Sequence, residues 1–175
     1  MNRLNIYKTH PSVYLPTFLT KQSACFDIAC QTFGKVEFKG YNNFNSPFTR
    51  PMRNGNIYVA PHERVLIPTG MILDIPEGYS VRVHPRSGIS LKQGLNLING
   101  QGIIDADYTD ELFILIHNVS DNGHMINNGD RIAQGELVKK EEYVLWEVFE
   151  KPGQKSEREG GMGSTGITVK IVDKT

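Results

Sequence analysis

The sequence has few cysteines and no excess of charge of either sign. Its 175 residues include only two cysteines, Cys25 and Cys30, which make neither a disulfide framework nor a zinc site. We therefore expect two reduced thiols. Lysine and arginine together number 19, as do aspartate and glutamate. The whole chain therefore has no general electrostatic attraction to nucleic acid or to an anionic membrane, and we expect neither as a partner.

Long apolar runs are also lacking. Residues 1–16 contain no apolar core of a signal peptide, and no run approaches the length that spans a bilayer. These features predict a soluble, cytoplasmic protein with no membrane contact. A length of 175 residues suits one domain that buries roughly two-thirds of its unfolded surface.

What is present is a series of short apolar runs separated by turn residues. They lie at residues 13–15, 58–60, 65–68, 71–75, 80–84, 112–116 and 131–138. Short strands with Gly, Pro, Asn or Asp between them are typical of an all-β sandwich or barrel. Residues 135–151 fit helical and strand periodicity about equally, and we favour a strand. The chain shows no strand-helix-strand rhythm, which argues against a parallel α/β sheet.

Residues 99–111 combine a turn with a cluster of acids. Asn99 and Gly100 stand between the apolar runs 95–98 and 103–104, and this pattern predicts a tight hairpin. Four acids then surround Tyr108, namely Asp105, Asp107, Asp110 and Glu111. Like charges repel on a β-like run, so these acids need a divalent cation or solvent as a partner.

The order Asn99, Gly102, Ile104-Asp105, Asp107-Tyr108 resembles the uracil-binding hairpin of the trimeric dUTP diphosphatases, or dUTPases. The resemblance implies that Asp105 is the catalytic base that activates the attacking water. It implies that Tyr108 packs under the deoxyribose. The base edge would be read by Asn99 and by the backbone at Gly102, Ile103, Ile104 and Phe113.

Three further segments resemble motifs of the same family in the expected order. Residues 23–30, SACFDIAC, place Asp27 on the acid that lies near the metal's water shell, with Cys25 where a Gly is usual. The alternative is an edge strand whose acid pairs with a neighbour. Phosphate contacts are implied for Arg86, Ser87, Gly88 and Gln134. Residues 85–88 also suit an ordinary turn before a short helix, and Arg131 suits either phosphate or Asp130.

The C-terminal residues resemble the mobile arm of the family. The arm would supply Arg158, Met162, Gly163, Ser164 and Thr165 to the nucleotide. In this sequence Met162 replaces an aromatic residue, and Arg158 is one residue nearer the glycines than usual. We therefore expect a β domain over 1–152 and a flexible Gly-rich arm over 153–175.

The resemblance implies a jelly-roll-like β domain assembled as a homotrimer. It implies hydrolysis of dUTP to dUMP and pyrophosphate with Mg²⁺ as the cofactor, which Asp27 contacts through water. Two alternatives are a dCTP deaminase-like enzyme of the same fold and a nucleotide-sensing regulator. The regulator would use the insertion at about 35–56, rich in Asn and aromatic residues, to bind a protein partner.

Overall fold

The structure is a computed structural model that describes residues 3–156. The chain divides into two compact units, residues 1–141 and residues 142–175, and each is described by itself. The elements of the first unit are β1 (Asn5–Lys8), β2 (Phe26–Ala29), β3 (Glu37–Tyr41), β4 (Pro47–Pro51), β5 (Ile57–Val59), β6 (Arg64–Pro68), β7 (Met71–Asp74), β8 (Tyr79–Pro85), α1 (Ser87–Gln93), β9 (Leu95–Leu97), β10 (Gly102–Ile104), β11 (Phe113–Asn118), β12 (His124–Ile126) and β13 (Arg131–Lys139).

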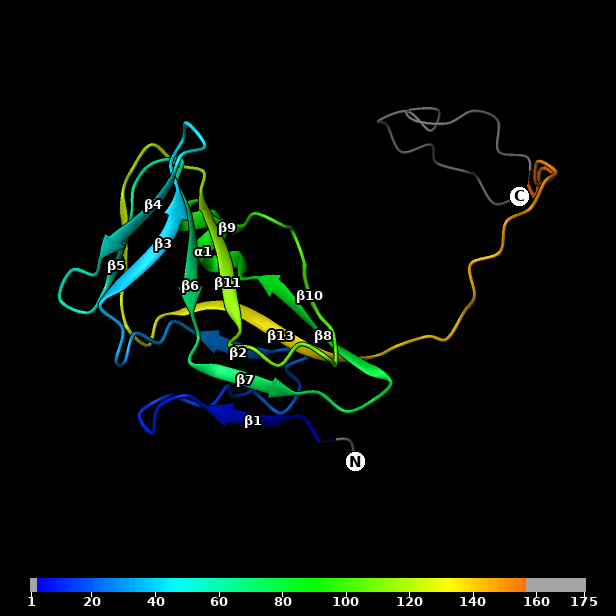
Figure 1. The fold of residues 1–175 in the computed structure, drawn as a ribbon, viewed down its shortest axis with the longest axis horizontal. Coiled ribbons are helices and arrows are strands. Elements are labelled where there is room, and N and C mark those ends of the chain that lie inside the picture. Colours follow the sequence, from blue (N-terminus) through cyan, green and yellow to red (C-terminus); the bar gives the residue numbers. More distant parts are fainter. Residues whose placement is uncertain (1–2, 157–175) are drawn as a thin grey trace, which may run out of the picture. The chain divides into compact units, whose positions relative to one another are not determined.

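Two main antiparallel sheets make up the first unit. One has the strand order β10-β8-β13-β2 and the other has the order β4-β3-β6-β11-β9. Figure 1 shows the second sheet above the first, with β7 and β1 as a separate pair below. Each sheet is apolar on its inner face, since Val81 and Val83 of β8 and Ile114 and Ile116 of β11 are all buried. One hydrophobic cluster joins both sheets, which confirms the expected all-β sandwich.

Six of the seven apolar runs predicted as strands lie in strands of the structure. The exception is residues 13–15, which form no strand. Val13 of that run is nevertheless buried, since its side chain lies against Gly70. Residues 135–151 are a strand only as far as Lys139. The second unit contains neither helix nor strand within residues 142–156. No helix in the described part of the chain is long and apolar enough to cross a membrane.

The sequence predicted a hairpin over residues 95–104. The turn is present, but the prediction that its two flanking strands pair with each other is wrong. Gly100 has a positive φ of 68°, as the turn requires. The strands on either side separate, because β9 pairs with β11 and β10 pairs with β8. The leucines of β9 are buried in the second sheet, and Gly102 of β10 packs against Val83 in the first sheet. The chain therefore crosses from one sheet to the other at this turn.

The insertion at about 35–56 contains a β-hairpin. Strands β3 and β4 pair over five residues, and β3 joins β6 so that the hairpin extends the second sheet. Pro47 and Pro51 are tolerated because β4 is the edge strand. Phe38 is buried, and the Arg50 guanidinium lies 4.3 Å from the centre of the Phe48 ring. The aromatic residues of the hairpin thus dock partly on their own subunit.

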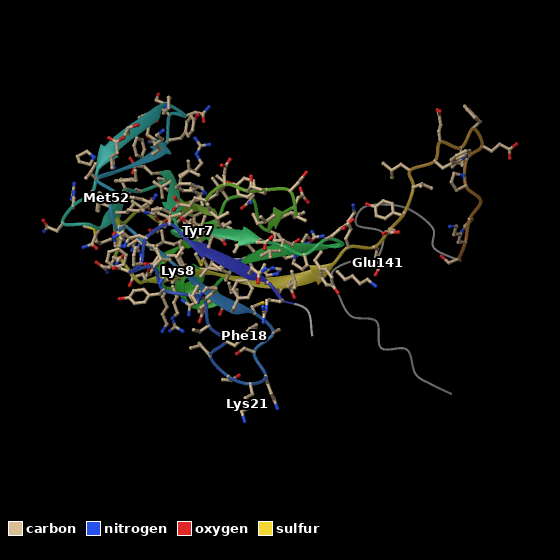
Figure 2. The ribbon with its side chains drawn as sticks, turned by 60° about the horizontal axis from the view of Figure 1, so that its bottom comes forward. Tyr7, Lys8, Phe18, Lys21, Met52 and Glu141 are labelled. Atoms are coloured by element: carbon tan, nitrogen blue, oxygen red, sulfur yellow. The ribbon has the colours of Figure 1, made fainter. Side chains whose placement is uncertain are left out.

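A loop before β2 carries Phe18 and Lys21 away from the body of the first unit (Figure 2). Phe18 is 58% exposed, yet its ring packs edge-on against the ring of Phe26 at 6.0 Å between centroids. This contact fixes the base of the loop where the chain enters β2. Figure 2 also labels Tyr7 and Lys8 on β1, Met52 after β4, and Glu141 at the end of the first unit.

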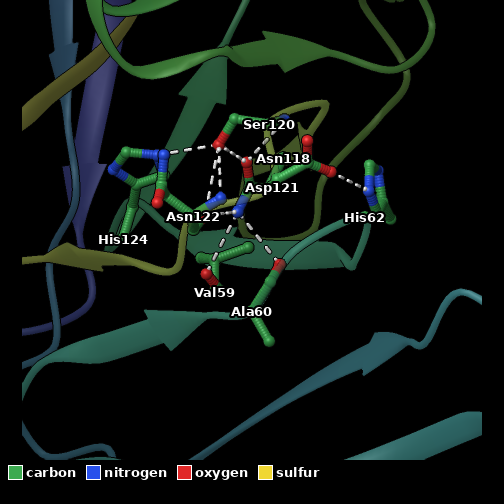
Figure 3. Close-up of polar contacts among 8 residues, drawn as sticks. All are labelled: Val59, Ala60, His62, Asn118, Ser120, Asp121, Asn122 and His124. Atoms are coloured by element: carbon green, nitrogen blue, oxygen red, sulfur yellow. Dashed lines mark hydrogen bonds and ion pairs between the residues drawn. The ribbon is translucent and has the colours of Figure 1, made fainter.

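Asn118 joins β11 to the segment around β5 through a buried hydrogen-bond network (Figure 3). Its amide nitrogen donates to the backbone carbonyls of Val59, Ala60 and Asn122 at 3.3, 3.0 and 2.7 Å. Its amide oxygen accepts from the N–H and the hydroxyl of Ser120. All of the amide's polar atoms are satisfied, which is what a buried side-chain amide requires.

Candidate active site

A pocket of about 570 Å³ lies where the chain crosses between the two sheets. Of the residues implied by the resemblance, its walls contain Asn99, Gly102, Ile103, Ile104, Asp105, Tyr108 and Phe113. Its remaining walls are largely aliphatic, including Leu66, Leu97 and Leu115, which the sequence analysis did not single out. The alternation of apolar residues along their strands was the available signal. The pocket has the mostly apolar, concave character of small-molecule sites.

The floor of this pocket is an edge strand. In the described part of the chain β10 pairs with β8 and with no other strand. The other edge of β10 therefore presents backbone N–H and C=O groups without a strand partner. Ile103 is 55% exposed, whereas Gly102 is buried against Val83. A Cβ at Gly102 would lie only 3.2 Å from the Val83 side chain. A planar heterocycle can hydrogen-bond to such an edge.

Asp105 and Tyr108 follow β10 directly. The carboxylate of Asp105 is exposed and makes no hydrogen bond or ion pair within residues 3–156. The backbone N–H of Tyr108 donates to the carbonyl of Asp105 at 3.2 Å, which closes a tight turn. The Tyr108 hydroxyl donates to the carbonyl of Glu111 at 2.9 Å, so the ring is held at its far end. Both side chains line the pocket, as does the exposed Asp107, and the unpaired carboxylate of Asp105 is available for proton transfer.

The acid cluster around Tyr108 is divided between two roles. Glu111 has protein partners, because its carboxylate lies 2.8 Å from Lys35 Nζ and accepts from the N–H of Gly70 at 2.9 Å. Asp107 and Asp110 are exposed to solvent like Asp105. The prediction that all four acids need a cation or solvent is therefore wrong for Glu111.

A second group of implied residues lies on the first sheet. Both oxygens of Asp27 are paired with guanidinium groups, Oδ1 with Arg86 Nε at 3.0 Å and Oδ2 with Arg131 Nη1 at 2.9 Å. Arg86 also donates from Nη1 to the backbone carbonyl of Arg131 at 2.7 Å. Gln134 donates from Nε2 to the carbonyl of Pro85 at 3.0 Å. The strand register brings these side chains together, because Gln134 on β13 pairs with Asp27 on β2.

We name the four residues Asp27, Arg86, Arg131 and Gln134 the guanidinium cluster. Arg131 pairs with Asp27, while Asp130 accepts hydrogen bonds from the backbone and side chain of Asn127. The suggested pairing of Arg131 with Asp130 is thus wrong. Asp27 does lie on an edge strand and does have paired neighbours, as the simpler interpretation of residues 23–30 held.

Ser87 and Gly88 begin helix α1, which follows the guanidinium cluster. Arg86 is the residue before the helix, and its side chain makes no capping hydrogen bond. Ser87 and Gly88 are both exposed, and a Cβ at Gly88 would meet no atom within 4 Å. The open space leaves room for a ligand beside the guanidinium cluster. A short helix does begin at Ser87, as the alternative interpretation of residues 85–88 held.

Both cysteines are free. Burial raises the pKa of Cys30 to about 12, with a further contribution from Asp130. The pKa of Cys25 is also raised, first by burial and then by the negative charges of Glu136 and Asp27. The implied arm residues Arg158, Met162, Gly163, Ser164 and Thr165 lie outside the described residues.

Comparison with known proteins agrees with this arrangement. The family model described as dUTPase matches residues 53–166. The chain is 34% identical over 165 residues to the deoxyuridine 5'-triphosphate nucleotidohydrolase of Syntrophotalea carbinolica, covering 94% of this chain and 97% of the relative. It is 44% identical over 117 residues to that of Finegoldia magna, covering 67% of this chain and 81% of the relative.

A solved structure of similar fold is a variant dUTPase of Staphylococcus bacteriophage 80alpha with dUpNHpp. It has a TM-score of 0.73 at 24% identity and covers 95% of this chain and 100% of its own. Another solved structure is a variant dUTPase of phage phi11 of S. aureus, described for its coordination of a structural Mg(II) ion. It has a TM-score of 0.67 at 23% identity and covers 87% of this chain and 100% of its own. The match to the family model over more than half of the chain, and to a relative over nearly its whole length, shows that this chain belongs to the dUTPase family.

Proposed function

We propose that this protein hydrolyses dUTP to dUMP and pyrophosphate. The observation that carries the proposal is the pocket in which the exposed carboxylate of Asp105 stands beside Tyr108 and the free edge of β10. Family membership and the names of the two bacterial relatives support the same reaction.

The free edge of β10 and the side chain of Asn99 select the base. Uracil presents an acceptor at C4 where cytosine presents a donor, so fixed backbone groups leave an unpaired polar group in the complex with cytosine. A methyl group at C5 would exclude thymine by its volume. Ile103, Ile104 and Phe113 frame the same surface. The aliphatic walls exclude water from the flat faces of the ring.

Asp105 acts as the general base. Its carboxylate accepts a proton from water and orients the oxygen for in-line attack at the α-phosphorus. The attacking oxygen forms the new P–O bond while the bond to the bridging oxygen breaks, and pyrophosphate leaves. No protein group competes for Asp105 within residues 3–156, so its lone pairs are available to that water.

The guanidinium cluster, with Ser87, Gly88 and residues 153–175, holds the triphosphate. Arg86 supplies charge-assisted donors, and Ser87 and Gln134 supply neutral ones. We propose that the chain divides by function as the sequence predicted, into a β domain over 1–152 and an arm over 153–175. The arm contributes Arg158, Met162, Gly163, Ser164 and Thr165 around the terminal phosphates.

Mg²⁺ fits this site only as an ion carried by the triphosphate. Asp27 already accepts from Arg86 and Arg131, and a carboxylate has about four lone-pair positions. Two positions thus remain for waters of the metal's hydration shell, which suits an ion that keeps several waters. When bound, Mg²⁺ neutralises charge that develops on pyrophosphate. Asp27, which pairs with the two arginine side chains, would accept hydrogen bonds from water bound to the metal.

We propose that the active unit is a homotrimer whose sites are shared between subunits. The pocket walls include Asp105 but neither Arg86, Ser87 nor Gln134. A site that needs both groups is therefore completed by another chain. In the second unit large apolar side chains are exposed, namely Tyr143, Val144, Leu145, Trp146, Val148 and Phe149. Such a dense apolar stretch is typical of a surface that another subunit covers.

A role in binding a protein partner is a second candidate, at the β3–β4 hairpin. Phe44 at its tip is 81% exposed and Tyr41 is 47% exposed, whereas Phe38 on the same hairpin is buried. Exposed aromatic residues on a rigid hairpin are typical of protein contacts. Phe44→Ser should leave dUTP hydrolysis unchanged and weaken such a complex in a binding assay. Loss of dUTP hydrolysis in Phe44→Ser would instead show that the hairpin supports the enzyme's own active structure.

A pyrophosphate-release assay on dUTP, dCTP, dTTP and UTP tests the main proposal. We expect dUTP to be hydrolysed with the highest kcat/KM by a wide margin. Release of ammonia from dCTP, measured in parallel, reports the alternative deaminase reaction. Ammonia without pyrophosphate would replace the proposed activity with that alternative, and nucleotide binding without either product would favour a regulator.

A further inference from the structure

Three side chains with metal-binding atoms converge on the polar face of the first sheet. They are Cys25, His84 and Glu136, and their ligand atoms all lie within 4.8 Å of one another. Cys25 directly precedes β2, His84 is on β8 and Glu136 is on β13. All three side chains are half-buried, so a metal ion can reach them and can be partly shielded from solvent.

The strand register explains why these residues meet. Gln134 on β13 pairs with Asp27 on β2 and with His84 on β8. Two residues further along the same faces come Glu136 and Cys25, because side chains alternate along a strand. His84 Nε2 already lies 2.9 Å from Glu136 Oε1. Glu136 and Cys25 therefore form the row next to the guanidinium cluster, and His84, which lies opposite Gln134, reaches Glu136 diagonally.

The structure assigns a zinc-binding site to Cys25, His84 and Glu136. One thiolate sulfur, one imidazole nitrogen and one carboxylate oxygen are ligands that zinc accepts together, with water in the fourth position. Sulfur and nitrogen ligands disfavour Mg²⁺, which prefers an all-oxygen shell. On binding, the thiol proton of Cys25 passes to solvent, and the thiolate and carboxylate charges balance the ion.

Only small movements separate the present arrangement from a tetrahedral site. Ligand atoms about 2.0–2.3 Å from zinc lie roughly 3.5 Å from one another. Because the ligand atoms lie within 4.8 Å of one another, the widest separation must close by at most roughly 1.3 Å, which a change of side-chain rotamer in half-buried residues can supply. The amide of Gln101 lies 3.4 Å from His84 Nδ1. A half-turn of that amide, which gives up the hydrogen bond from Arg82 Nη1 at 3.4 Å, places an oxygen there to accept the Nδ1 proton, as in most metal-bound histidines.

Counting cysteines gave the opposite expectation, because two cysteines alone cannot make a zinc site. The structure adds His84 and Glu136 from strands that are remote from Cys25 in the sequence. Family members that carry Gly in place of Cys25 lack the thiol. The competing interpretation is an ordinary pair between His84 and Glu136 with a thiol beside it by chance. That interpretation predicts no metal-thiolate bond.

Cobalt titration of the full chain distinguishes the two. Co²⁺ replaces zinc in tetrahedral sites, and a cobalt-thiolate bond gives a charge-transfer absorption in the near ultraviolet. We expect this band to appear in metal-stripped, reduced protein and to saturate at one Co²⁺ per chain. Zn²⁺ should bleach the band and excess Mg²⁺ should not. Zn²⁺ should also raise the melting temperature, because it binds the folded state.

The two cysteines supply a matched control, since the sequence contains no others. Cys25→Ser and Cys25→Gly should abolish the band, whereas Cys30→Ala should retain it because Cys30 is fully buried and lies outside the cluster. Glu136→Gln preserves side-chain shape and should weaken Co²⁺ binding at least ~10-fold, the scale of a lost metal-site interaction. Circular dichroism of each variant confirms that the chain is folded.

Absence of the band in the wild-type chain would overturn the assignment. Retention of the band in folded Cys25→Ser, or its loss in folded Cys30→Ala, would do the same. None of these measurements depends on nucleotide hydrolysis. Failure of the zinc site is therefore distinguishable from failure of the proposed enzymatic function.

Discussion

Lys35 Nζ lies 2.8 Å from the carboxylate of Glu111, and this ion pair ties the start of the β3–β4 hairpin to the loop that carries Asp105 and Tyr108. The other oxygen of Glu111 accepts from the backbone N–H of Gly70. Tyr108 in turn donates to the carbonyl of Glu111. The hairpin thus supports the catalytic loop although none of its own residues lines the pocket.

Replacing Lys35 with methionine should lower the free energy of unfolding by about 1–2 kcal/mol. The change leaves a half-buried carboxylate without its cation. We also expect KM for dUTP to rise, because the loop that positions Tyr108 loses a restraint. Lys39→Met is the matched control, since Lys39 is exposed on the same hairpin and forms no ion pair with a described residue. Equal effects of both changes, in urea unfolding and steady-state kinetics, would contradict this role.

Asp105→Asn should reduce kcat by at least ~100-fold while dUTP binding is largely retained, because an amide cannot accept the proton from water. Single-turnover kinetics and calorimetric binding of a non-hydrolysable analogue measure the two effects separately. Asp110→Asn is a control, as that exposed acid does not line the pocket. Near-normal turnover of Asp105→Asn would remove Asp105 from the mechanism.

Tyr108→Ala should lower kcat/KM for dUTP and narrow the ratio of dUTP to UTP hydrolysis. We propose that the ring packs against the deoxyribose, so that shortening it opens space for a 2′-hydroxyl. Each tenfold change in the ratio corresponds to about 1.4 kcal/mol of differential transition-state binding. Tyr108→Phe removes only the hydrogen bond to Glu111 and should preserve the ratio. An unchanged ratio in Tyr108→Ala, with a lowered melting temperature, would make Tyr108 a structural residue.

Truncation after Gly153 should leave a folded trimer with poor turnover. In our proposal the removed residues supply phosphate contacts and exclude water, and they fall in the second compact unit rather than the first. Analytical ultracentrifugation and pyrophosphate release measure assembly and activity. Full activity of the truncated chain, or its aggregation, would count against the proposed arm.

Trp146 offers a direct test of assembly because it is the single tryptophan of the chain. In the isolated chain it is 84% exposed. If another subunit covers residues 143–149, its fluorescence in the assembled protein should be blue-shifted, and dilution to single chains should shift it to the red. Leu145→Asp should favour the single-chain spectrum. A red, concentration-independent emission from a proven trimer would place this segment outside the interface.

The fold class followed from the sequence because alternation of apolar residues is a local property. Short apolar runs bounded by turn residues predicted strands at the positions of β8, β11 and β13, and the structure buries their apolar residues between the two sheets. Pairing is not local. Nothing in residues 95–104 indicates that β9 and β10 join different sheets, since this depends on β8 and β11 being available as partners.

The same distinction applies to the candidate site. Motif order alone identified Asp27, Arg86 and Gln134, and the structure brings them together on neighbouring strands. The partners of Glu111 and of Arg131 were not predictable, because Lys35 and Asp27 are far from them in the sequence. Burial decided these pairings, since a shielded charge takes the opposite charge that the fold places beside it.

The free edge of β10 also bears on how the protein behaves in storage. An unpaired strand edge is a template on which a strand of another molecule can add, and such additions propagate into aggregates. A nucleotide that hydrogen-bonds to this edge blocks the template as well as occupying the catalytic pocket. Ligand-free preparations should therefore precipitate sooner than those kept with a non-hydrolysable nucleotide, even at temperatures where both remain folded.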